Sequence, residues 1–276
     1  MRITTIVALF NRRATLQRCL DSVLGQSWGG RELIVIDGGS TDGGVEILRA
    51  CAPRLAYWES APDRGLSHAF NKGVQKATGD WIHFLGADDY LWDANVMARM
   101  APHLSEAFPR HRVVYAHANY VAQSGEILER LGQPWAPFRR RFLQGGMIPH
   151  IAVFHHRSLF QARGAYDESL RWAGDYEMLL RELKDGEPLF VPDVVVAAFQ
   201  FGGQSSAPGN VLGVLRETRR ALSMNGIRFP GVLWYAALAR ALIRIALWRV
   251  LGERATKRLL DLGRALMGKP AFWTRI

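Results

Sequence analysis

The sequence predicts an α/β fold: a Rossmann-like, mostly parallel sheet flanked by helices, with a helical, basic appendage at the C-terminal end. In the first half of the chain, short apolar runs rich in β-branched residues alternate with amphipathic segments of helical length. This alternation is typical of parallel strands joined by crossover helices. The 276 residues are 49% hydrophobic, which is enough to bury a large core. From about Pro208 onward the pattern becomes helical and basic.

The first part of the chain alternates between expected strands and expected helices. Apolar, β-branched runs indicate the strands, and apolar residues at helical spacing indicate the helices. Thr15 is the expected N-cap of the first helix, because its hydroxyl can accept a backbone N–H there. The strands are expected at residues 3–10, 32–36, 54–60 and 81–85, and the helices at 15–24, 42–51, 66–77 and 93–104.

The middle of the chain is less regular. Residues 112–128 predict a hairpin that turns near Ser124 and Gly125. The segment "GQPWAPFRRRF" at 132–142 is expected to be a basic loop, because prolines interrupt it. Beyond it, a strand is expected at 150–156, a helix at 175–183, and one or two strands within 188–201.

The last fifty residues are strongly basic. Only Glu253 and Asp261 oppose a series of arginines and lysines there. If Gly252 does not interrupt the helix, four of the arginines fall near one side of it. Interfacial aromatic residues accompany them, and together they predict a helix pair lying on an anionic membrane, with core packing of the tryptophans as the alternative. The four arginines are Arg240, Arg244, Arg254 and Arg258, and the aromatic residues are Trp234, Tyr235, Trp248 and Trp273.

Charge and cysteine content narrow the class of protein. A net charge of +10 predicts affinity for anions without choosing among phosphates, nucleic acid and acidic membranes. The two cysteines, Cys19 and Cys51, predict neither a disulfide framework nor a metal site, which fits a reducing cytosol. The N-terminal apolar run is too short for a signal peptide. Arginines interrupt the longest apolar stretch, 232–251, and argue against a simple membrane span.

Acidic residues follow three of the expected strands. Asp37 ends the second strand, Asp63 follows the third, and Asp88 and Asp89 follow the fourth. Ligands of open parallel sheets bind beyond the carboxyl ends of the strands, so these acids are expected to gather at one edge. Mg²⁺ or Mn²⁺ bound there would relieve the repulsion between the adjacent carboxylates and would hold phosphate oxygens.

Each of these acids also has a simpler structural explanation. Asp37 could begin a turn at Gly38-Gly39, Asp42 could be an N-cap, and the pair Asp88-Asp89 could cap a following helix. The chain contains neither a P-loop motif nor a G-x-G-x-x-G motif after the first strand. A P-loop NTPase is therefore excluded, and a dinucleotide-binding protein is disfavoured.

Four segments, by their order and spacing, resemble the inverting family 2 glycosyltransferases, which have the GT-A fold. The segments are "TIVALFNRRATLQRCLDSVLGQSW" (5–28), "ELIVIDGGSTDGG" (32–44), "APDRGLSHAFNKGVQKATGDWIHFLGADD" (61–89) and "AGDYEMLLREL" (173–183). The resemblance implies transfer of a sugar from a nucleotide diphosphate sugar, usually with Mg²⁺ or Mn²⁺. It implies a GT-A domain at 1–205, with a nucleotide-sugar half at 1–110 and an acceptor half at 111–205, followed by a helical tail at 206–276.

The resemblance also assigns roles to residues. Asp37 would bind the base or ribose, Asp63 would help to hold the nucleoside, and Asp88 and Asp89 would form the metal motif, with Asp89 as the direct ligand. Asp175 would be the catalytic base that takes the proton of the acceptor hydroxyl. The remaining residues expected to contact the nucleotide sugar are Ala8, Phe10, Asn11, Arg13, Gly65, Asn71 and Lys72.

The acceptor side is less sharply defined. His150 is a candidate contact, and Glu177 is a candidate contact or substitute base if Asp175 serves only as an N-cap. The chain lacks the Q-x-x-R-W element of processive synthases and has no multispan region. A single-sugar enzyme of polysaccharide or lipopolysaccharide assembly is therefore expected, acting on a glycan or a polyprenyl-diphosphate-linked acceptor at the inner face of the cytoplasmic membrane.

Two other functions compete with this interpretation. A sugar-phosphate nucleotidyltransferase would usually carry a glycine-rich phosphate loop after the first strand, where this chain has "FNRRATL". A non-catalytic nucleotide-binding protein would bind the donor without turnover. Nucleic acid is not an expected partner, because clustered acids would repel its phosphates.

Overall fold

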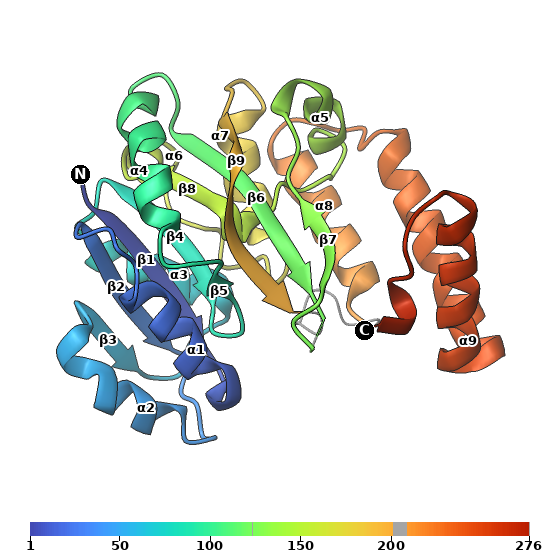
Figure 1. Cartoon of the computed structure of the whole chain (residues 1–276). Coiled ribbons are helices and arrows are strands. Elements are labelled where there is room, and N and C mark those ends of the chain that lie inside the picture. The colour runs from blue at the N-terminus through green and yellow to red at the C-terminus, as the bar shows by residue number, and fades with distance from the viewer. Residues whose placement is uncertain (123, 201–208, 276) are drawn as a thin grey trace.

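The computed structural model describes residues 1–122, 124–200 and 209–275, and within them one twisted sheet runs through the molecule (Figure 1). The strand order is β3-β2-β1-β4-β8-β6-β9-β5, with β7 paired to β6. Strands β1 to β4 are parallel, whereas β8 is antiparallel to both of its neighbours. The strands are β1 (Ile3–Leu9), β2 (Arg31–Asp37), β3 (Tyr57–Ser60), β4 (Trp81–Gly86), β5 (Tyr90–Leu91), β6 (Val113–Val121), β7 (Ile127–Leu131), β8 (Val153–His156) and β9 (Leu189–Gln200).

Helices cover both faces of this sheet, which confirms the predicted α/β class. One core lies under α1, α2 and α4, and the other lies under α3 and α5 to α8. Strand β1 contributes side chains to both cores. Val7 faces the first core and Ile6 faces the second, because successive side chains of a strand point to opposite faces of the sheet. The helices are α1 (Arg13–Leu24), α2 (Gly44–Cys51), α3 (Leu66–Lys76), α4 (Val96–Ala107), α5 (Trp135–Phe142), α6 (Ser158–Arg163), α7 (Gly174–Leu183), α8 (Val211–Met224) and α9 (Val232–Leu266), with 3₁₀ turns η1 (Ala52–Arg54), η2 (His150–Ala152) and η4 (Trp273–Arg275).

The segment expected to be a basic loop is a helix, α5. Its side chains Trp135, Phe138 and Phe142 are buried at spacings of three and four residues, so one face of the helix packs into the core. The prolines do not prevent this, because Pro134 precedes the helix and Pro137 stands within its first turn. The three consecutive arginines concealed the apolar face in the sequence.

The start of the first helix also differs from the prediction. Helix α1 begins at Arg13, and the Thr15 hydroxyl donates to the Arg12 carbonyl from inside the first turn instead of capping it. The first helical N–H, that of Arg13, donates to the Asp42 carboxylate, which also accepts the Gly44 N–H at the start of α2. Asp42 therefore ties the N-terminal ends of two helices together.

Most other elements appear where the sequence predicts them. Strands β6 and β7 form the expected antiparallel hairpin, and β9 is one strand where one or two were expected. The short helix α6 was not predicted. Cys19 and Cys51 are both buried and free.

The C-terminal part contains α8, the long α9 and η4. The expected boundary between residues 205 and 206 lies outside the described residues. Gly252 adopts a left-handed φ of 74° and interrupts α9, so the expected single face of arginines across it does not form. In Figure 1 the chain changes direction at this break.

Within the described part of the chain, no helix has the length and hydropathy to cross a membrane.

Close packing of α3 on β1 generates a prediction about stability. A Cβ on Gly73 would lie 2.4 Å from the Ile6 side chain, so Gly73→Ala must push the helix away from the sheet. We expect a loss of about 1–3 kcal/mol in the free energy of unfolding, measured by urea denaturation.

The matched control is Gly263→Ala, also in a helix, where a Cβ would meet nothing within 4 Å. It should be neutral or stabilising by up to about 1 kcal/mol. Equal effects of the two substitutions would contradict the close approach of α3 to β1.

Candidate active site

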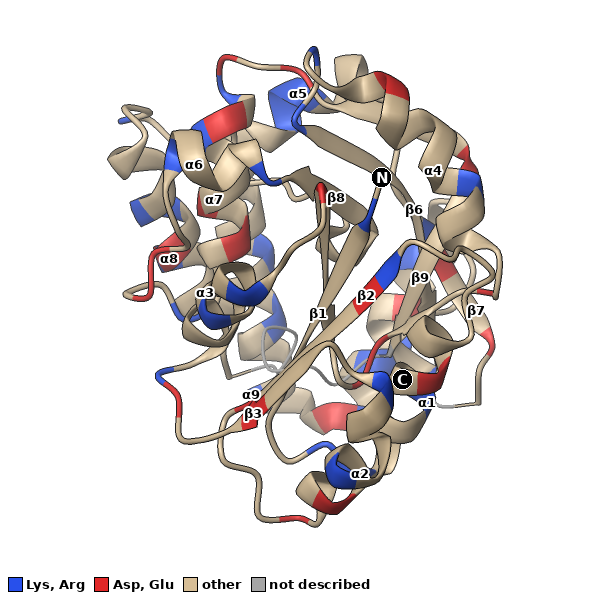
Figure 2. Ribbon diagram, turned by 90° about the vertical axis from the view of Figure 1, so that its left-hand side faces the viewer, with Lys and Arg blue, Asp and Glu red and all other residues tan. Residues whose placement is uncertain are grey.

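The carboxyl ends of the parallel strands form the edge on which the candidate site lies. Register places Leu9 beside Asp37, Asp37 beside Ser60, and Ala8 beside Gly86. Strand β1 carries no charged residue, and charged positions occur mainly at strand ends and on helices and loops (Figure 2). The acids that follow β2, β3 and β4 are therefore brought to one edge of the sheet, as parallel strands dictate.

Asp37 is fully buried at the end of β2. Its carboxylate accepts the backbone N–H and hydroxyl of Ser40 and the hydroxyl of Ser60. These bonds shape the loop after β2 and fix it to the end of β3. Asp37 therefore begins a turn, as the simpler structural explanation predicts. This turn lies at the edge of the sheet where the resemblance places the nucleoside.

Asp63 lies directly over this loop. A Cβ on Gly38 would be 2.6 Å from the Asp63 Oδ2 atom, so only glycine permits the contact. The other carboxylate oxygen accepts the N–H of Gly65, which begins α3 with a φ of 114°. Asp63 and Gly65 thus border the loop that follows Asp37.

Asn11 joins the loops after β1 and β2. Its φ of 51° is unusual for a residue other than glycine. Its N–H donates to the Ser40 hydroxyl, and its side-chain oxygen accepts the Thr41 N–H at 2.9 Å. Among the other expected contacts on this loop, Ala8 accepts the Ala87 N–H, Phe10 is 53% exposed, and Arg13 holds Asp42 through its backbone.

Asp88 and Asp89 follow β4 and do not cap a helix, because the next helix begins only at Val96. Asp89 accepts the Gly86 N–H at 3.1 Å. Burial, together with the neighbouring charge of Asp88, raises the pKa of Asp89 well above its usual range. Asp88 forms an ion pair with Arg12, with Nε and Oδ2 3.3 Å apart.

The adjacent carboxylates fit a divalent cation that also binds substrate. Among the described residues, no group of three or more histidines, cysteines and acids could enclose a metal ion. Mg²⁺ is commonly held by one or two carboxylates together with phosphate oxygens of the substrate. Asp88 and Asp89 supply that donor set, and burial, followed by the charge of Asp88, raises the pKa of Asp89.

Two expected donor contacts are engaged within the protein. Asn71 exchanges hydrogen bonds with the backbone of Tyr166 and also donates to Glu168, so it anchors the loop that precedes α7. Lys72 forms an ion pair with Glu59 on β3, with Nζ and Oε1 2.7 Å apart. Both residues stabilise the walls of the site.

Asp175 stands in the first turn of α7 and is not the N-cap, which is Ala173. Burial raises its pKa from the ordinary value of 3.8 to about 6. Burial raises the pKa of the Tyr166 phenol, and the charge of Asp175 raises it further. A carboxylate with a pKa near neutral is suited to accept a proton from a hydroxyl group.

A carboxylate from α8 holds the start of α7. Glu217 accepts three consecutive backbone N–H groups, from Arg171 (3.0 Å), Trp172 (2.7 Å) and Ala173 (3.0 Å). These donors end two residues before Asp175, so Glu217 holds the start of α7 in place. Asp175 is thereby positioned by a residue of the expected tail.

The two acceptor-side candidates differ in their surroundings. The His150 ring stacks on Phe84, and its Nε2 atom lies 3.3 Å from the Tyr166 hydroxyl. Burial lowers the pKa of His150 to about 4, so the ring is neutral at physiological pH. Glu177 is buried and faces away, forming an ion pair with Arg181 and accepting from Asn225.

Three residues around the site were not identified from the sequence. Arg12 could have been found, because it follows the first strand within "FNRRATL". Tyr166 gives no local signal, because its role depends on the charge of Asp175 and on its interaction with His150, both distant in the chain or outside its own element. Glu217 gives none either, because the backbone groups that it binds are more than forty residues away in the chain.

Sequence comparisons identify related proteins. The model described as Glycosyl transferase family 2 matches residues 4–168. The chain is 34% identical over 259 residues to a Mycobacterium tuberculosis protein named PGL/p-HBAD biosynthesis glycosyltransferase, covering 88% of this chain and 96% of that protein. It is 35% identical over 218 residues to an uncharacterised glycosyltransferase of the same species, covering 78% and 82%.

Solved structures share the fold. S. aureus TarS 1–349 in complex with UDP-GlcNAc superposes with a TM-score of 0.63 at 17% identity, over 96% of this chain and 78% of that one. A mannosyltransferase from Pyrobaculum calidifontis, in complex with GDP-Man and Mn²⁺, gives 0.62 at 18% identity, over 96% and 80%. These similarities confirm the GT-A fold, and the family match shows that the chain belongs to glycosyl transferase family 2.

Proposed function

We propose that this glycosyltransferase moves a single hexose, with inversion, from a nucleotide diphosphate sugar to a hydroxyl group of its acceptor. The observation that carries the proposal is the pair Asp88-Asp89, which is held at the carboxyl edge of the sheet with Arg12 as its only ion-pair partner among the described residues. Such a pair favours binding of a divalent cation, and a diphosphate supplies the oxygens that complete the cation's coordination.

The donor is proposed to lie across the ends of β1, β2 and β4. Asp37 and Asn11 order the loop over which the base and ribose would lie, and Asp63 closes it from the β3 side. Mg²⁺ or Mn²⁺, held by Asp89 and Asp88, would stabilise the negative charge of the departing diphosphate. The complexes of similar proteins with UDP-GlcNAc, and with GDP-Man and Mn²⁺, support this assignment.

Asp175 is proposed as the general base. Its ionised carboxylate takes the proton of the acceptor hydroxyl, while that oxygen attacks the anomeric carbon from the face opposite the diphosphate. The bond between the anomeric carbon and the phosphate oxygen breaks, and the configuration inverts. Tyr166, which responds to the charge of Asp175, and its neutral partner His150 are proposed as acceptor-side groups that can hydrogen bond to a sugar hydroxyl.

The acceptor is proposed to be a glycan or a lipid-linked saccharide of the cell surface, including one carried on a polyprenyl diphosphate. The names of two relatives support such a molecule. One is the mycobacterial PGL/p-HBAD biosynthesis enzyme. The other is the hyaluronan synthase of Pasteurella multocida, 25% identical over 237 residues that form 84% of this chain and 24% of that enzyme. The enzyme would act in the cytoplasm, at the inner face of the membrane.

The pKa of Asp175 generates a prediction about pH. Because only the ionised carboxylate accepts a proton, and its pKa is raised to about 6, kcat/KM should fall as the pH decreases through about 6. Asp175→Asn should lower kcat by about 10²- to 10⁴-fold and leave nucleotide affinity unchanged. The measurement is donor hydrolysis and transfer, with the initial anomer assigned by proton NMR.

Asp185→Asn is the matched control, because Asp185 is exposed just beyond the other end of α7. It should behave as wild type. Full activity of Asp175→Asn, or a product that retains the donor's configuration, would reject the proposed role of Asp175.

Glu217 generates a second prediction about activity. Glu217→Ala releases three backbone N–H groups at the start of α7, and misplacing Asp175 by about 1 Å should lower kcat by about 10²-fold. The apparent pKa in the pH profile should shift, whereas nucleotide affinity should not, because the donor contacts lie on other elements. Glu217→Gln, which retains an acceptor oxygen, should restore part of the activity.

The control is Arg216→Ala, an exposed neighbour on the same helix. If Glu217→Ala changes only thermal stability and leaves both kcat and the pH profile intact, Glu217 does not position the base.

A further inference from the structure

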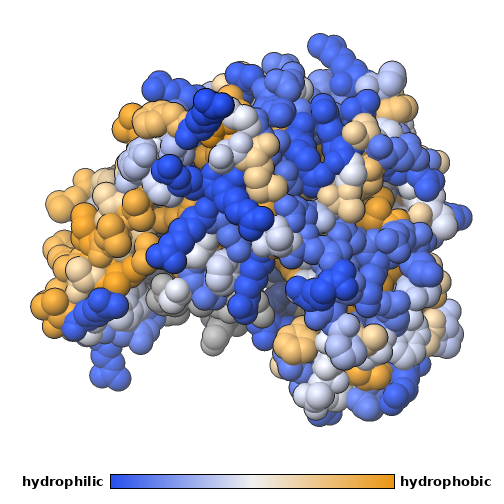
Figure 3. Space-filling model, turned by 180° about the vertical axis from the view of Figure 1, so that it is seen from behind, coloured by the Kyte–Doolittle hydropathy of each residue, from blue (hydrophilic) through white to orange (hydrophobic). Residues whose placement is uncertain are grey.

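The outer surface of α9 and its flanking residues exposes an unusual amount of apolar side chain. Only Trp234, Ala241, Thr256 and Asp261 are buried in this helix of 35 residues. Figure 3 shows a broad hydrophobic area on this side of the molecule. The exposed large apolar residues are Phe229, Val232, Leu233, Tyr235, Leu242, Ile243, Val250, Leu251, Leu259, Leu262, Leu266 and Met267.

Before Gly252 these residues form a stripe. At about 100° per residue, Val232, Ile243 and Val250 lie opposite Trp234 and Ala241, which face the protein, and the other members of the stripe lie beside them. This half of α9 therefore has two apolar sides, and only one of them is covered. The stripe consists of Val232, Tyr235, Leu242, Ile243 and Val250.

The half after Gly252 repeats the arrangement. Leu259, Leu262 and Leu266 lie on the side of the helix away from the buried Asp261. Val250 and Leu266, one in each half, are the most exposed of the set at 81% and 84%. Isolated exposed apolar residues are ordinary, but a contiguous set of this size indicates a binding surface.

Unpaired positive charge accompanies both stripes. Arg240, Arg249, Arg254 and Arg258 are exposed and form no ion pair with any described residue. The two acids of α9 are engaged internally. Glu253 pairs with Lys257 at 2.9 Å, and Asp261 accepts the backbone N–H groups of residues 272–274. The surface therefore combines apolar area with net positive charge.

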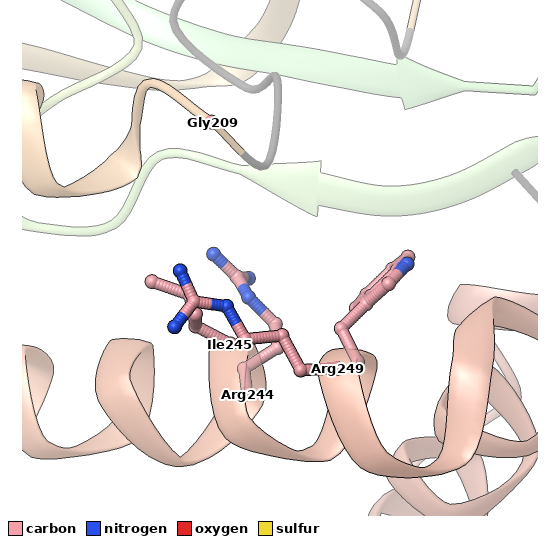
Figure 4. Close-up of a pocket in the computed structure, with 5 residues that line it drawn as sticks. Gly209, Arg244, Ile245 and Arg249 are labelled. Carbon is pink, nitrogen blue, oxygen red and sulfur yellow. The ribbon is translucent and has the colours of Figure 1, made fainter.

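A pocket lies behind the first stripe (Figure 4). It has a volume of about 240 Å³ and is lined by Gly209, Arg244, Ile245, Trp248 and Arg249. Arg244 and Arg249 project from the helix toward it, and Arg244 stacks over the Trp273 ring at 5.2 Å. Neither guanidinium has a carboxylate partner among the described residues, so the charge remains available to an anion such as a phosphate group.

We propose that α9 is a docking surface for an anionic lipid bilayer. The leucine, isoleucine and valine side chains of the stripes enter the boundary between headgroups and acyl chains, and the arginines contact lipid phosphates. Arginines recur along both halves of α9, so each half lies parallel to the bilayer plane. This inference rests on the proposed function only in one respect: a bilayer docked at α9 would bring a lipid-linked acceptor near the site. Binding of the bilayer itself requires neither donor nor acceptor.

Vesicle co-sedimentation of the full chain tests the apolar part of the surface. Wild type should bind phosphatidylcholine vesicles that contain phosphatidylglycerol. The double variant Val250→Ser/Leu266→Ser should bind at least about tenfold more weakly, because two exposed apolar anchors are lost. Both side chains are exposed, so folding should be unaffected. The control is Ile127→Ser, which removes an exposed apolar residue of β7 and should bind as wild type.

Charge is tested in the same assay. Each arginine removed should weaken binding by about fivefold, so Arg240→Gln/Arg258→Gln should lose about 25-fold, whereas the exposed Arg110→Gln should change nothing. High salt should weaken binding by wild type. Equal binding to vesicles of phosphatidylcholine alone, or no binding to either, would overturn the proposal.

A second copy of the chain is the competing occupant of this surface. A dimer in solution that Val250→Ser/Leu266→Ser converts to monomers, without vesicle binding by wild type, would also overturn the proposal. Because none of these measurements requires turnover, their failure is distinguishable from failure of the proposed transferase activity.

Discussion

Repulsion between two adjacent carboxylates is the constraint on which the site depends. Asp88 and Asp89 cannot move apart, because the chain is held in the sheet on both sides of them. Before them, Gly86 pairs with Ala8 on β1, and after them Tyr90 and Leu91 pair with β9. Burial, followed by the charge of Asp88, raises the pKa of Asp89. Arg12 pairs with Asp88, and a bound cation would offset the remaining negative charge.

The acid that we propose as the base is positioned by a different part of the fold. Asp175 owes its position to a short helix whose start is held by Glu217 from α8, and owes its raised pKa to burial beside aromatic residues. The proposed donor site and the proposed base therefore lie in separate parts of the fold. The proposed donor edge depends on parallel strands, and the position of Asp175 depends on packing between α7 and α8, so substitutions in one part can be distinguished from those in the other.

The sequence predicted the features that depend on local pattern. The alternation of strands and helices, the acids at strand ends and the order of the four quoted segments identified the fold and the family. Helix α5 was missed because three arginines concealed the spacing of Trp135, Phe138 and Phe142. Glu217 could not be predicted, because its partners are distant in the chain. The break at Gly252 was left open, since glycine permits both a helix and a left-handed turn.

The most direct test of the central claim is calorimetric titration of UDP, GDP and dTDP into the full chain, with and without Mn²⁺. If Asp88 and Asp89 hold a cation together with a diphosphate, one nucleotide should bind tightly only with the metal. This binding should disappear in Asp89→Asn and persist in Asp193→Asn, which changes an exposed acid on β9. Equal nucleotide binding without metal, or unchanged binding by folded Asp89→Asn, would contradict the claim.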